Sequence, residues 1–168
     1  RPRHLAKKRF RWWPLLPAAL ALQAVVEREG VPAPFALLMV SYAYLLVFAA
    51  ANLRHRGMGV VLVGIALNAA VIGANHGMPV RASAIAAASG DHRVPASLGQ
   101  VKRHLADGDE RLMFLGDIIP ARPLRQVLSF GDLVLVVGVA DVVAHLLRPT
   151  RRRRRQSTRR PASPQAAP

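Results

Sequence analysis

Uncharged, largely apolar residues gather into long blocks along the chain, and the charged residues lie between these blocks. The clearest block runs for 24 residues from Gly30 to Leu53, and a second runs for 19 residues from Gly57 to Asn75. A helix needs about 20 apolar residues to cross the hydrocarbon core of a bilayer. These two blocks therefore predict two membrane-spanning helices, and the short turn Arg54–Arg56 makes them antiparallel neighbours.

A shorter block and a final block complete the pattern. The shorter one, Trp12 to Val26, has 15 uncharged positions, and as a helix it covers about 22 Å of a roughly 30 Å hydrocarbon core. Its tryptophans favour the headgroup level of a membrane, and the long stems of Arg9 and Arg11 can snorkel to extend it. We therefore expect a tilted or snorkelled span, with an interfacial or signal-like segment as the alternative. The final block begins at Ser129, where Asp132 completes a predicted capping box, and it continues to Leu147.

The predicted fold class is therefore all-α, an integral membrane helix bundle with four spans in this chain. A basic arm (1–11) precedes the membrane domain (12–148), and an Arg-rich tail (149–168) follows it. Residues 80–128 mix short Ala-rich pieces with charged ones, which favours a partly helical connection outside the bilayer. The tail has no apolar periodicity, and we expect it to be disordered.

The composition supports a membrane protein and excludes several other classes. Of the 168 residues, 52% are hydrophobic and 20% are charged, whereas a soluble domain carries about 25% charge spread along the chain. Disordered chains, coiled coils and ordinary soluble enzyme domains are thereby excluded. The chain has no cysteine, which excludes disulfides, thiolate nucleophiles and Cys-ligated metal sites.

The distribution of Lys and Arg predicts the orientation and the partners. The arm, the Arg54–Arg56 turn and the end of the chain from Arg148 onward together carry 16 of them, against 8 in the Glu27–Glu29 turn and the 80–128 connection. By the positive-inside rule, both termini of a cell-membrane protein then lie in the cytoplasm and the connection lies outside. The arm and the tail suit anionic lipid headgroups of the bilayer. A nucleic-acid partner is not expected, because the tail has no aromatic residue for base stacking.

Two asparagines inside a predicted span are candidate functional residues. Asn68 and Asn75 are seven residues apart and so lie along one helix face. One interpretation is helix association through amide hydrogen bonds and small residues, including the GxxxG spacing of Gly73 and Gly77. The alternative is a hydrated path or a contact with a substrate.

A polar ladder in the last predicted span offers a second candidate. Asp141, His145 and Arg148 stand at positions i, i+4 and i+7, so they climb one face of the helix toward its end. An ionisable residue inside a span is costly unless it is paired, which makes Asp141 a functional candidate. Asp141 and His145 are interpreted either as a structural ion pair or as a proton or cation relay.

Two further carboxylates form a candidate motif at the outer surface. Asp117 interrupts an apolar run that ends at Pro120, and Asp132 stands in the first turn of the last span, so both are expected near the same outer surface. A structural turn, a pair with Arg122 or Arg125, and a ligand contact all stay open for them.

Catalytic, cofactor-binding and metal-ligating motifs are not found in the sequence. The chain has no nucleophile elbow, HExxH motif, P-loop or dinucleotide fingerprint. Residues 107–110 superficially resemble the start of a calcium loop, but Ile118 stands where an EF-hand requires a bidentate glutamate. We therefore expect no catalytic, cofactor or metal residues.

Several segments resemble a known family. Arg111 to Pro120 and then Val127 to Leu133 resemble a family of small polytopic bacterial membrane proteins, frequent in actinobacteria and known as a domain of unknown function. Asn75 to Pro79, and the basic arm that leads into Trp12, are similar to further pieces of that family in the same order. The resemblance covers most of residues 5–148. It implies a further span before the arm, and hence five spans in the full-length protein, but it transfers no activity.

The sequence leaves two main hypotheses about function. The first is a non-enzymatic membrane component, a helper subunit or scaffold with a membrane-protein partner. The alternative is a small transporter or a proton or cation conductance protein that uses Asn68, Asn75 and Asp141. A lipid-acting enzyme at the outer interface, through Asp117 or His76, would need an acid-base pair that the sequence does not offer.

Overall fold

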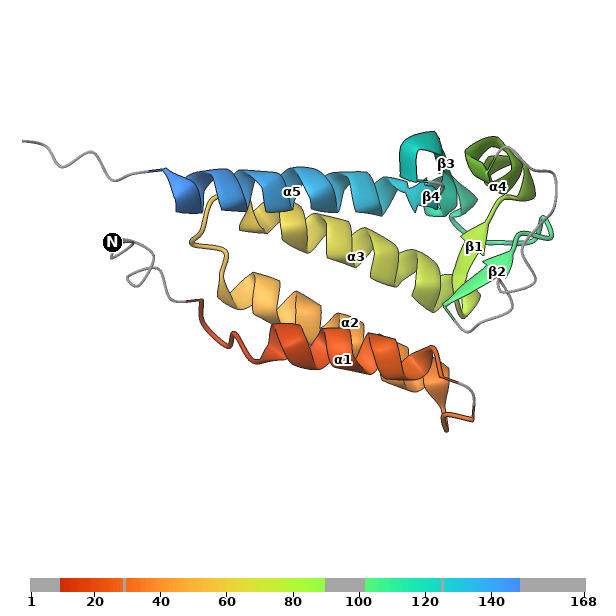
Figure 1. Cartoon of the computed structure of the whole chain (residues 1–168). Helices are drawn as coiled ribbons and strands as arrows, with labels where there is room; N and C mark the ends of the chain where they lie inside the picture. Colours follow the sequence, from red (N-terminus) through yellow and green to blue (C-terminus); the bar gives the residue numbers. More distant parts are fainter. Residues whose placement is uncertain (1–9, 29, 90–101, 125, 149–168) are drawn as a thin grey trace, which may run out of the picture.

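A long helical bundle with a small sheet at one end makes up the described part of the chain (Figure 1). The computed structural model describes residues 10–28, 30–89, 102–124 and 126–148. Within these residues the bundle contains α1 (Leu15–Val26), α2 (Pro34–Ala51), α3 (Met58–Asn75) and α5 (Phe130–Leu147). The arm up to residue 9 and the tail from residue 149 lie outside the described residues, so the disorder expected for the tail stays a prediction.

Three of the predicted spans are confirmed as helices of sufficient length. The helices α2, α3 and α5 each have 18 residues and are long and apolar enough to cross a membrane. The helix α1 has only 12 residues, about 18 Å at 1.5 Å per residue. Four spans are therefore not confirmed, because the first predicted span forms a helix shorter than the hydrocarbon core.

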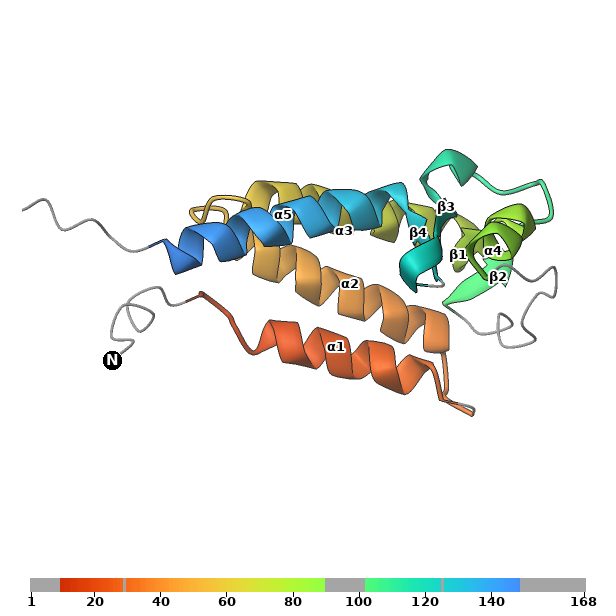
Figure 2. The same ribbon diagram turned by 45° about the horizontal axis from the view of Figure 1, so that its top comes forward.

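The four long elements run alternately up and down the bundle. Figure 2 shows α5 against α3, with α2 beside them and α1 outermost. The helix α1 packs on α2, α2 contacts α3, and α3 packs most extensively on α5. The bundle therefore has two halves, the α1–α2 hairpin and the α3–α5 pair. These halves join mainly through α2 and α3.

Glycines set the close packing of α3 against α5. A Cβ added at Gly64 would lie 2.7 Å from the backbone nitrogen of Leu135, and one added at Gly138 would lie 2.6 Å from that of Val61. A Cβ added at Gly73, part of the predicted GxxxG spacing, would instead meet the Sδ of Met39 on α2, at 3.8 Å. Close backbone approach of this kind is typical of helices that associate within lipid.

Apolar side chains cover the outer face of α5. Val136, Val137 and Leu147 are each more than 60% exposed. Water would disfavour such a surface, whereas lipid tails solvate it well. The exposed valines and leucines therefore support a bundle that lies in a bilayer.

A mixed four-stranded sheet caps one end of the bundle, so the all-α prediction is not confirmed. Its strand order is β2-β1-β3-β4, with β1 parallel to β2 and β3 and with β3 antiparallel to β4. The strands are short, and they comprise β1 (Met78–Val80), β2 (Arg103–Leu105), β3 (Asp117–Ala121) and β4 (Gln126–Ser129). The described residues 78–89, 102–124 and 126–129 thus form a folded unit, here called the sheet cap, and its first strand begins three residues after the end of α3.

Two kinds of helix complete the sheet cap. The helix α4 (Ala82–Ser89) follows β1, in agreement with the prediction that the 80–128 connection is partly helical. It buries Ala84 and Ile85 against Val80 of β1 and Val127 of β4. The short 3₁₀ helices η3 (Met113–Leu115) and η4 (Arg122–Leu124) flank β3, and the Arg122 Nε donates a hydrogen bond to the carbonyl of Ala87 at 3.2 Å.

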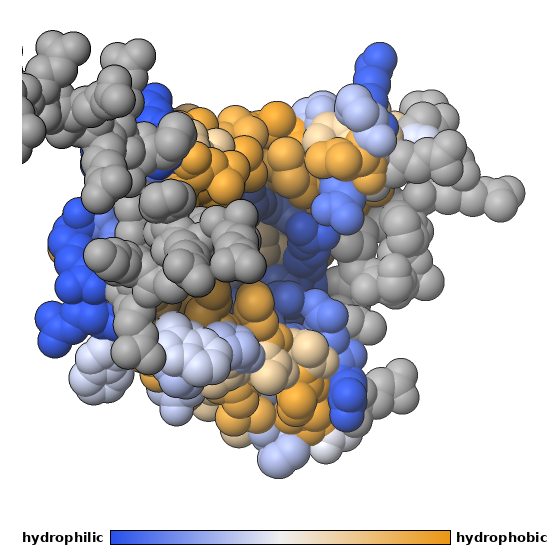
Figure 3. Space-filling view, turned by 60° about the vertical axis from the view of Figure 1, so that its left-hand side comes forward, coloured by the Kyte–Doolittle hydropathy of each residue, from blue (hydrophilic) through white to orange (hydrophobic). Residues whose placement is uncertain are grey.

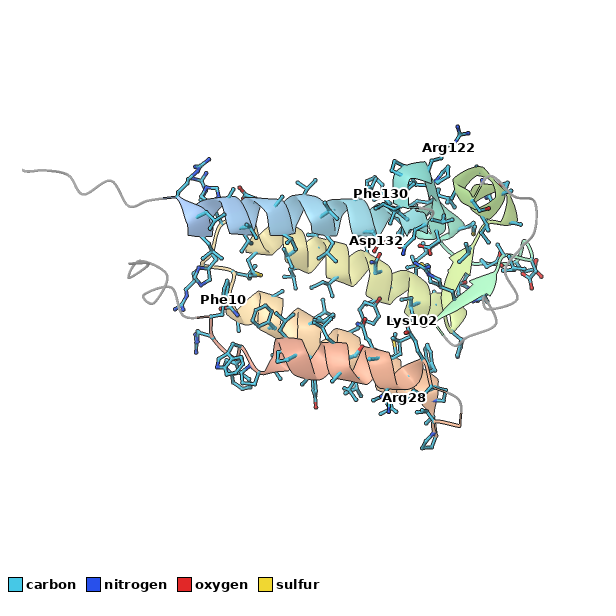
Figure 4. The ribbon with its side chains drawn as sticks, viewed as in Figure 1. Phe10, Arg28, Lys102, Arg122, Phe130 and Asp132 are labelled. Atoms are coloured by element: carbon cyan, nitrogen blue, oxygen red, sulfur yellow. The ribbon has the colours of Figure 1, made fainter. Side chains whose placement is uncertain are left out.

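An asparagine ties down the chain at the opposite end of the bundle. The fully buried Asn52 follows α2, and its Oδ1 accepts a hydrogen bond from the backbone N–H of Arg11 at 2.8 Å. Its Nδ2 donates to the carbonyl of Arg11, also at 2.8 Å. Phe10, labelled in Figure 4, packs against the rings of Phe48 and His55. These contacts hold the entry to α1 against the end of α2.

Candidate functional site

A polar cleft opens where the two halves of the bundle meet the sheet cap. Its volume is about 540 Å³, within the range of about 300–1,000 Å³ usual for small-ligand sites. Figure 3 shows hydrophilic residues in the hollow between the two hydrophobic halves. Every long helix of the bundle and every strand of the sheet cap contributes to the lining or adjoins it, and the lining residues are Glu27, Tyr42, Asn68, Ile72, Met78, Lys102, Arg103, Asp117, Gln126 and Asp132.

The wall formed by α3 and α5 is a closed hydrogen-bond network around the start of α5. The predicted capping box is confirmed: the Ser129 Oγ accepts from the Asp132 backbone N–H, and Asp132 Oδ2 accepts from the Ser129 N–H, each at 3.0 Å. Asn68 joins this box from α3, since its Nδ2 donates to Asp132 Oδ1 at 2.7 Å. Ser129 Oγ in turn donates to Asn68 Oδ1 at 3.0 Å. Asn68 therefore fixes the Asp132 carboxylate at the cleft and links two helices.

The wall formed by the sheet cap carries a buried carboxylate. Asp117 begins β3 and is only 1% exposed. Its Oδ2 lies 3.1 Å from the Nε of Arg103 on β2, yet it accepts no hydrogen bond from any described residue. Burial raises the pKa of the Asp117 carboxyl to about 6, with a further contribution from the negative charge of Asp132 and an opposing one from Arg103.

The remaining charges stand at the mouth of the cleft. Lys102 Nζ lies 2.9 Å from Glu27 Oε1 just beyond α1, and both side chains are partly exposed. In Figure 4, Lys102 and Asp132 lie at the same end of the bundle. The pair ties the sheet cap to the α1–α2 hairpin. The lining of the cleft therefore contains two ion pairs, Lys102 with Glu27 and Arg103 with Asp117.

The two halves of the predicted outer-surface motif meet at this cleft. Asp117 and Asp132 both line it, and Asp117 is directly paired in the sheet with Ser129, the cap of α5. Of the partners that the sequence left open, the structure brings neither Asp117 nor Asp132 to Arg122. Asp117 is paired with Arg103 instead.

The two candidate asparagines of α3 do different things. Asn68 lines the cleft, whereas Asn75 lies at the end of α3 and holds a loop of the sheet cap. Asn75 Nδ2 donates to the carbonyl of Arg111 and its Oδ1 accepts from the Arg111 N–H, both at 2.8 Å. The structure therefore does not place the two amides along one path.

The polar ladder of α5 stands at the far end of the bundle. His145 Nδ1 lies 2.9 Å from Asp141 Oδ1, with Arg148 beside the other ring nitrogen at 3.4 Å. A Cβ added at Gly57, which caps the start of α3, would lie 3.0 Å from the Asp141 Cβ. Asp141 is therefore level with the first residues of α3 and not with its middle. His145 also borders a second, smaller cavity of about 240 Å³ next to the basic turn Arg54–Arg56.

A cluster of apolar side chains separates the ladder from the cleft. Its buried members include Val61 and Ile65 on α3 and Val142 on α5, with Leu135 packed against them. Asp132 and Asp141 are nine residues apart on α5, about 13 Å along the axis. The residues proposed for a conducting path therefore fall into groups at opposite ends of the bundle.

Sequence reasoning missed three important polar residues. Arg103 and Tyr42 line the cleft, and Asn52 anchors the entry to α1. Asn52 carried a usable signal, because an amide next to a basic turn at the end of a span commonly caps backbone groups. The pairing of Arg103 carried none, because its partner comes from a strand that has no sequence pattern.

Metal ligation finds no support in the described ranges. Across residues 10–28, 30–89, 102–124 and 126–148, no group of three or more His, Cys, Asp or Glu side chains could hold a metal ion. The Glu110 carboxylate of the calcium-like segment instead accepts hydrogen bonds from the backbone N–H groups of Asp107 and Gly108. That segment forms a self-contained acidic turn.

Comparison with known proteins identifies the family of the chain. No curated protein and no solved structure matches it. Residues 7–144 match a family of unknown function, DUF5317, which confirms the expected domain of unknown function. The match includes the four helices of the bundle and the sheet cap, up to residue 144 in α5. The chain therefore belongs to the DUF5317 family.

Proposed function

We propose that the chain is a multi-pass integral protein of the cell membrane. Three helices with suitable length and hydropathy support this, together with the exposed apolar face of α5. The helix α1 is the fourth span and crosses a locally thinned region of the bilayer, with Trp12 and Trp13 at the headgroup level. Both tryptophans are at least 60% exposed at its start.

The orientation proposed for the bundle follows its charges. The start of α1, the α2–α3 turn and the end of α5 share one end of the bundle (Figure 1), and the stretches of sequence that contain or adjoin these points, 1–11, 54–56 and 148–168, carry 16 of the 24 Lys and Arg residues. This end faces the cytoplasm and its anionic lipid headgroups. The sheet cap and the mouth of the cleft then face outward.

Within this frame the protein is a non-enzymatic membrane component that binds a ligand in the polar cleft. The observation that carries this proposal is a cavity of about 540 Å³, lined by three carboxylates and two cations, in an otherwise apolar bundle. A buried carboxylate such as Asp117 is costly unless it serves a site or pairs closely. The apolar cluster below the cleft favours binding over conduction, because it separates the cleft from the Asp141 end.

Cysteine labelling tests whether the cleft is a binding site. The cysteine-free chain allows Gln126→Cys at the cleft to be compared with Ser83→Cys, an exposed position on α4 away from it. Each variant is purified in detergent, and its rate of maleimide labelling is measured before and after addition of mixed phosphatidylethanolamine, phosphatidylglycerol and cardiolipin.

The two positions should respond differently to the lipids. We expect labelling of Gln126→Cys to slow several-fold, while labelling of Ser83→Cys changes little. Equal rates at Gln126→Cys with and without the lipids would contradict a membrane-borne ligand in the cleft, and so would equal slowing at both positions.

A further inference from the structure

The charges that line the cleft do not balance. Glu27 pairs with Lys102, and Asp117 pairs with Arg103. Asp132 accepts hydrogen bonds from neutral donors, the Asn68 amide and the Ser129 N–H, but no cation of the described chain pairs with it. The lining therefore carries one more carboxylate than it carries cations.

A second observation also indicates that the carboxylates of the cleft lack a hydrogen-bond donor. Asp117 is almost completely buried at the cleft, and its Oδ2 accepts no hydrogen bond within the described ranges. A buried carboxylate oxygen normally finds a donor, and each one that does not requires an explanation. Two carboxylates that repel one another thus face the cleft with unused acceptor capacity.

We propose that the cleft binds a primary ammonium group, which the Asp132 carboxylate receives with the Tyr42 hydroxyl beside it. This deepens the proposed function and rests on it. Tyr42 lines the same cleft as Asp132 and Asp117, and the charges of both carboxylates act on it. An ammonium has three donors and one positive charge, so it supplies what the carboxylate excess of the lining lacks.

The rest of the lining fits a ligand in which an anion accompanies the ammonium. Lys102 and Arg103 are adjacent in the chain, and each pairs with a carboxylate of the lining but stays partly exposed, so a phosphate near the mouth can share them with these carboxylates. The headgroup of phosphatidylethanolamine joins a phosphate and a primary ammonium through two carbons. The same chemistry occurs in free ethanolamine and its phosphate ester, so the source is either a lipid or a small amine.

Native mass spectrometry of the detergent-purified full chain measures this preference directly. The ratio of lipid-bound to free protein is compared for phosphatidylethanolamine and phosphatidylglycerol with the same acyl chains, because only the first carries an ammonium. We expect the ethanolamine lipid to bind about tenfold more tightly, the usual order for a charge-assisted hydrogen bond. Added free ethanolamine distinguishes the two sources of the ammonium. If it displaces the lipid, the ammonium group alone is sufficient for binding; if it does not, the ligand is a lipid.

Matched variants assign the effect to the cleft. Asp132→Asn should remove the preference for the ethanolamine lipid, whereas Asp141→Asn, the same change at the other end of α5, should keep it. Tyr42→Phe serves where Asp132→Asn fails to fold, because none of the described residues hydrogen bonds to this hydroxyl. It should lower the preference about twofold to tenfold.

Three results would overturn the ammonium proposal. They are equal binding of the two lipids with no displacement of either by free ethanolamine, a full preference in folded Asp132→Asn or Tyr42→Phe, and equal losses in Asp132→Asn and Asp141→Asn. If mixed lipids still protect Gln126→Cys from labelling while the two lipids bind equally and free ethanolamine displaces neither, cleft binding stands and the ammonium assignment falls. If neither effect occurs and free ethanolamine displaces no lipid, both proposals fall.

Discussion

Replacing Gly64 by alanine should loosen the α3–α5 pair. The added Cβ would lie 2.7 Å from the Leu135 backbone nitrogen, 2.9 Å from the Leu135 Cα and 3.0 Å from the Gly131 carbonyl oxygen. Carbon atoms in good contact are about 3.5–4.0 Å apart, and backbone atoms cannot rotate away as a side chain can. The two helices must therefore separate by about 1 Å.

The cost follows from two terms. Overpacking of a close interface costs about 1–3 kcal/mol. Separation also stretches the 2.7 Å hydrogen bond from Asn68 Nδ2 to Asp132 Oδ1, which adds about 1 kcal/mol. The preference of alanine over glycine inside a helix offsets about 0.5–1 kcal/mol of this, so we expect Gly64→Ala to lower the free energy of unfolding by about 1–3.5 kcal/mol.

Gly73 on the same helix provides the matched control. A Cβ there meets only the Met39 Sδ, at an ordinary contact distance of 3.8 Å. Alanine is favoured over glycine inside a helix by about 0.5–1 kcal/mol, so Gly73→Ala should be neutral or stabilising. Reversible unfolding by sodium dodecyl sulfate in mixed micelles, followed by circular dichroism, measures both variants. Equal effects of Gly64→Ala and Gly73→Ala would refute the proposed helix contact.

Three further predictions concern single side chains. Asp117 has its pKa raised from 3.8 to about 6 in the folded protein, so the folded state holds a proton that the unfolded state releases. Stability should therefore fall as the pH rises from about 4 to about 6, by up to about 3 kcal/mol, and unfolding titrations should show this slope disappear in Asp117→Asn. Ser129→Ala removes the α5 cap and should cost about 0.5–2 kcal/mol in the same assay; an unchanged midpoint would contradict the network. Asn52→Ala frees the Arg11 backbone, so hydrogen exchange at the Arg11 amide should accelerate strongly, and an unchanged exchange rate would show that other contacts hold it.

The helices were predictable because their determinants are local. A run of 18 apolar residues forms a helix in a bilayer whatever surrounds it, and the bounds of α2, α3 and α5 fall within a few residues of the predicted spans. The cap of α5 was predictable for the same reason, since Ser129 and Asp132 stand three residues apart. Local spacing alone specifies such features.

The sheet cap was not predictable because its strands depend on distant partners. The strand β1 has three residues and contains Pro79 in its middle, and proline inside a strand argues against a strand in sequence reasoning. Its hydrogen bonds instead run through neighbouring residues, as when Met78 N–H donates to the carbonyl of Lys102 at 2.8 Å. The strand exists because residues more than 20 positions away pair with it.

The residues of the cleft were likewise predictable only in part. Asp117, Asp132 and Asn68 were identified as candidates from their residue types, and the structure brings all three to one cavity. Arg103 and Tyr42 come from segments where nothing in the sequence marks them. The glycine contacts were predictable in part. The seven-residue spacings of Gly57 with Gly64 and of Gly131 with Gly138 are visible in the sequence, but the pairing of the two helices through them is not.

The most direct test of the whole arrangement measures from which side of the membrane a labelling reagent reaches the cleft. Gln126→Cys lies at the cleft and Arg56→Cys lies in the basic turn at the other end of the bundle. A membrane-impermeant maleimide should label Gln126→Cys in intact cells and should label Arg56→Cys only after permeabilisation. Labelling of Arg56→Cys from outside, or of both positions without permeabilisation, would contradict a membrane-spanning bundle whose polar cleft opens outward.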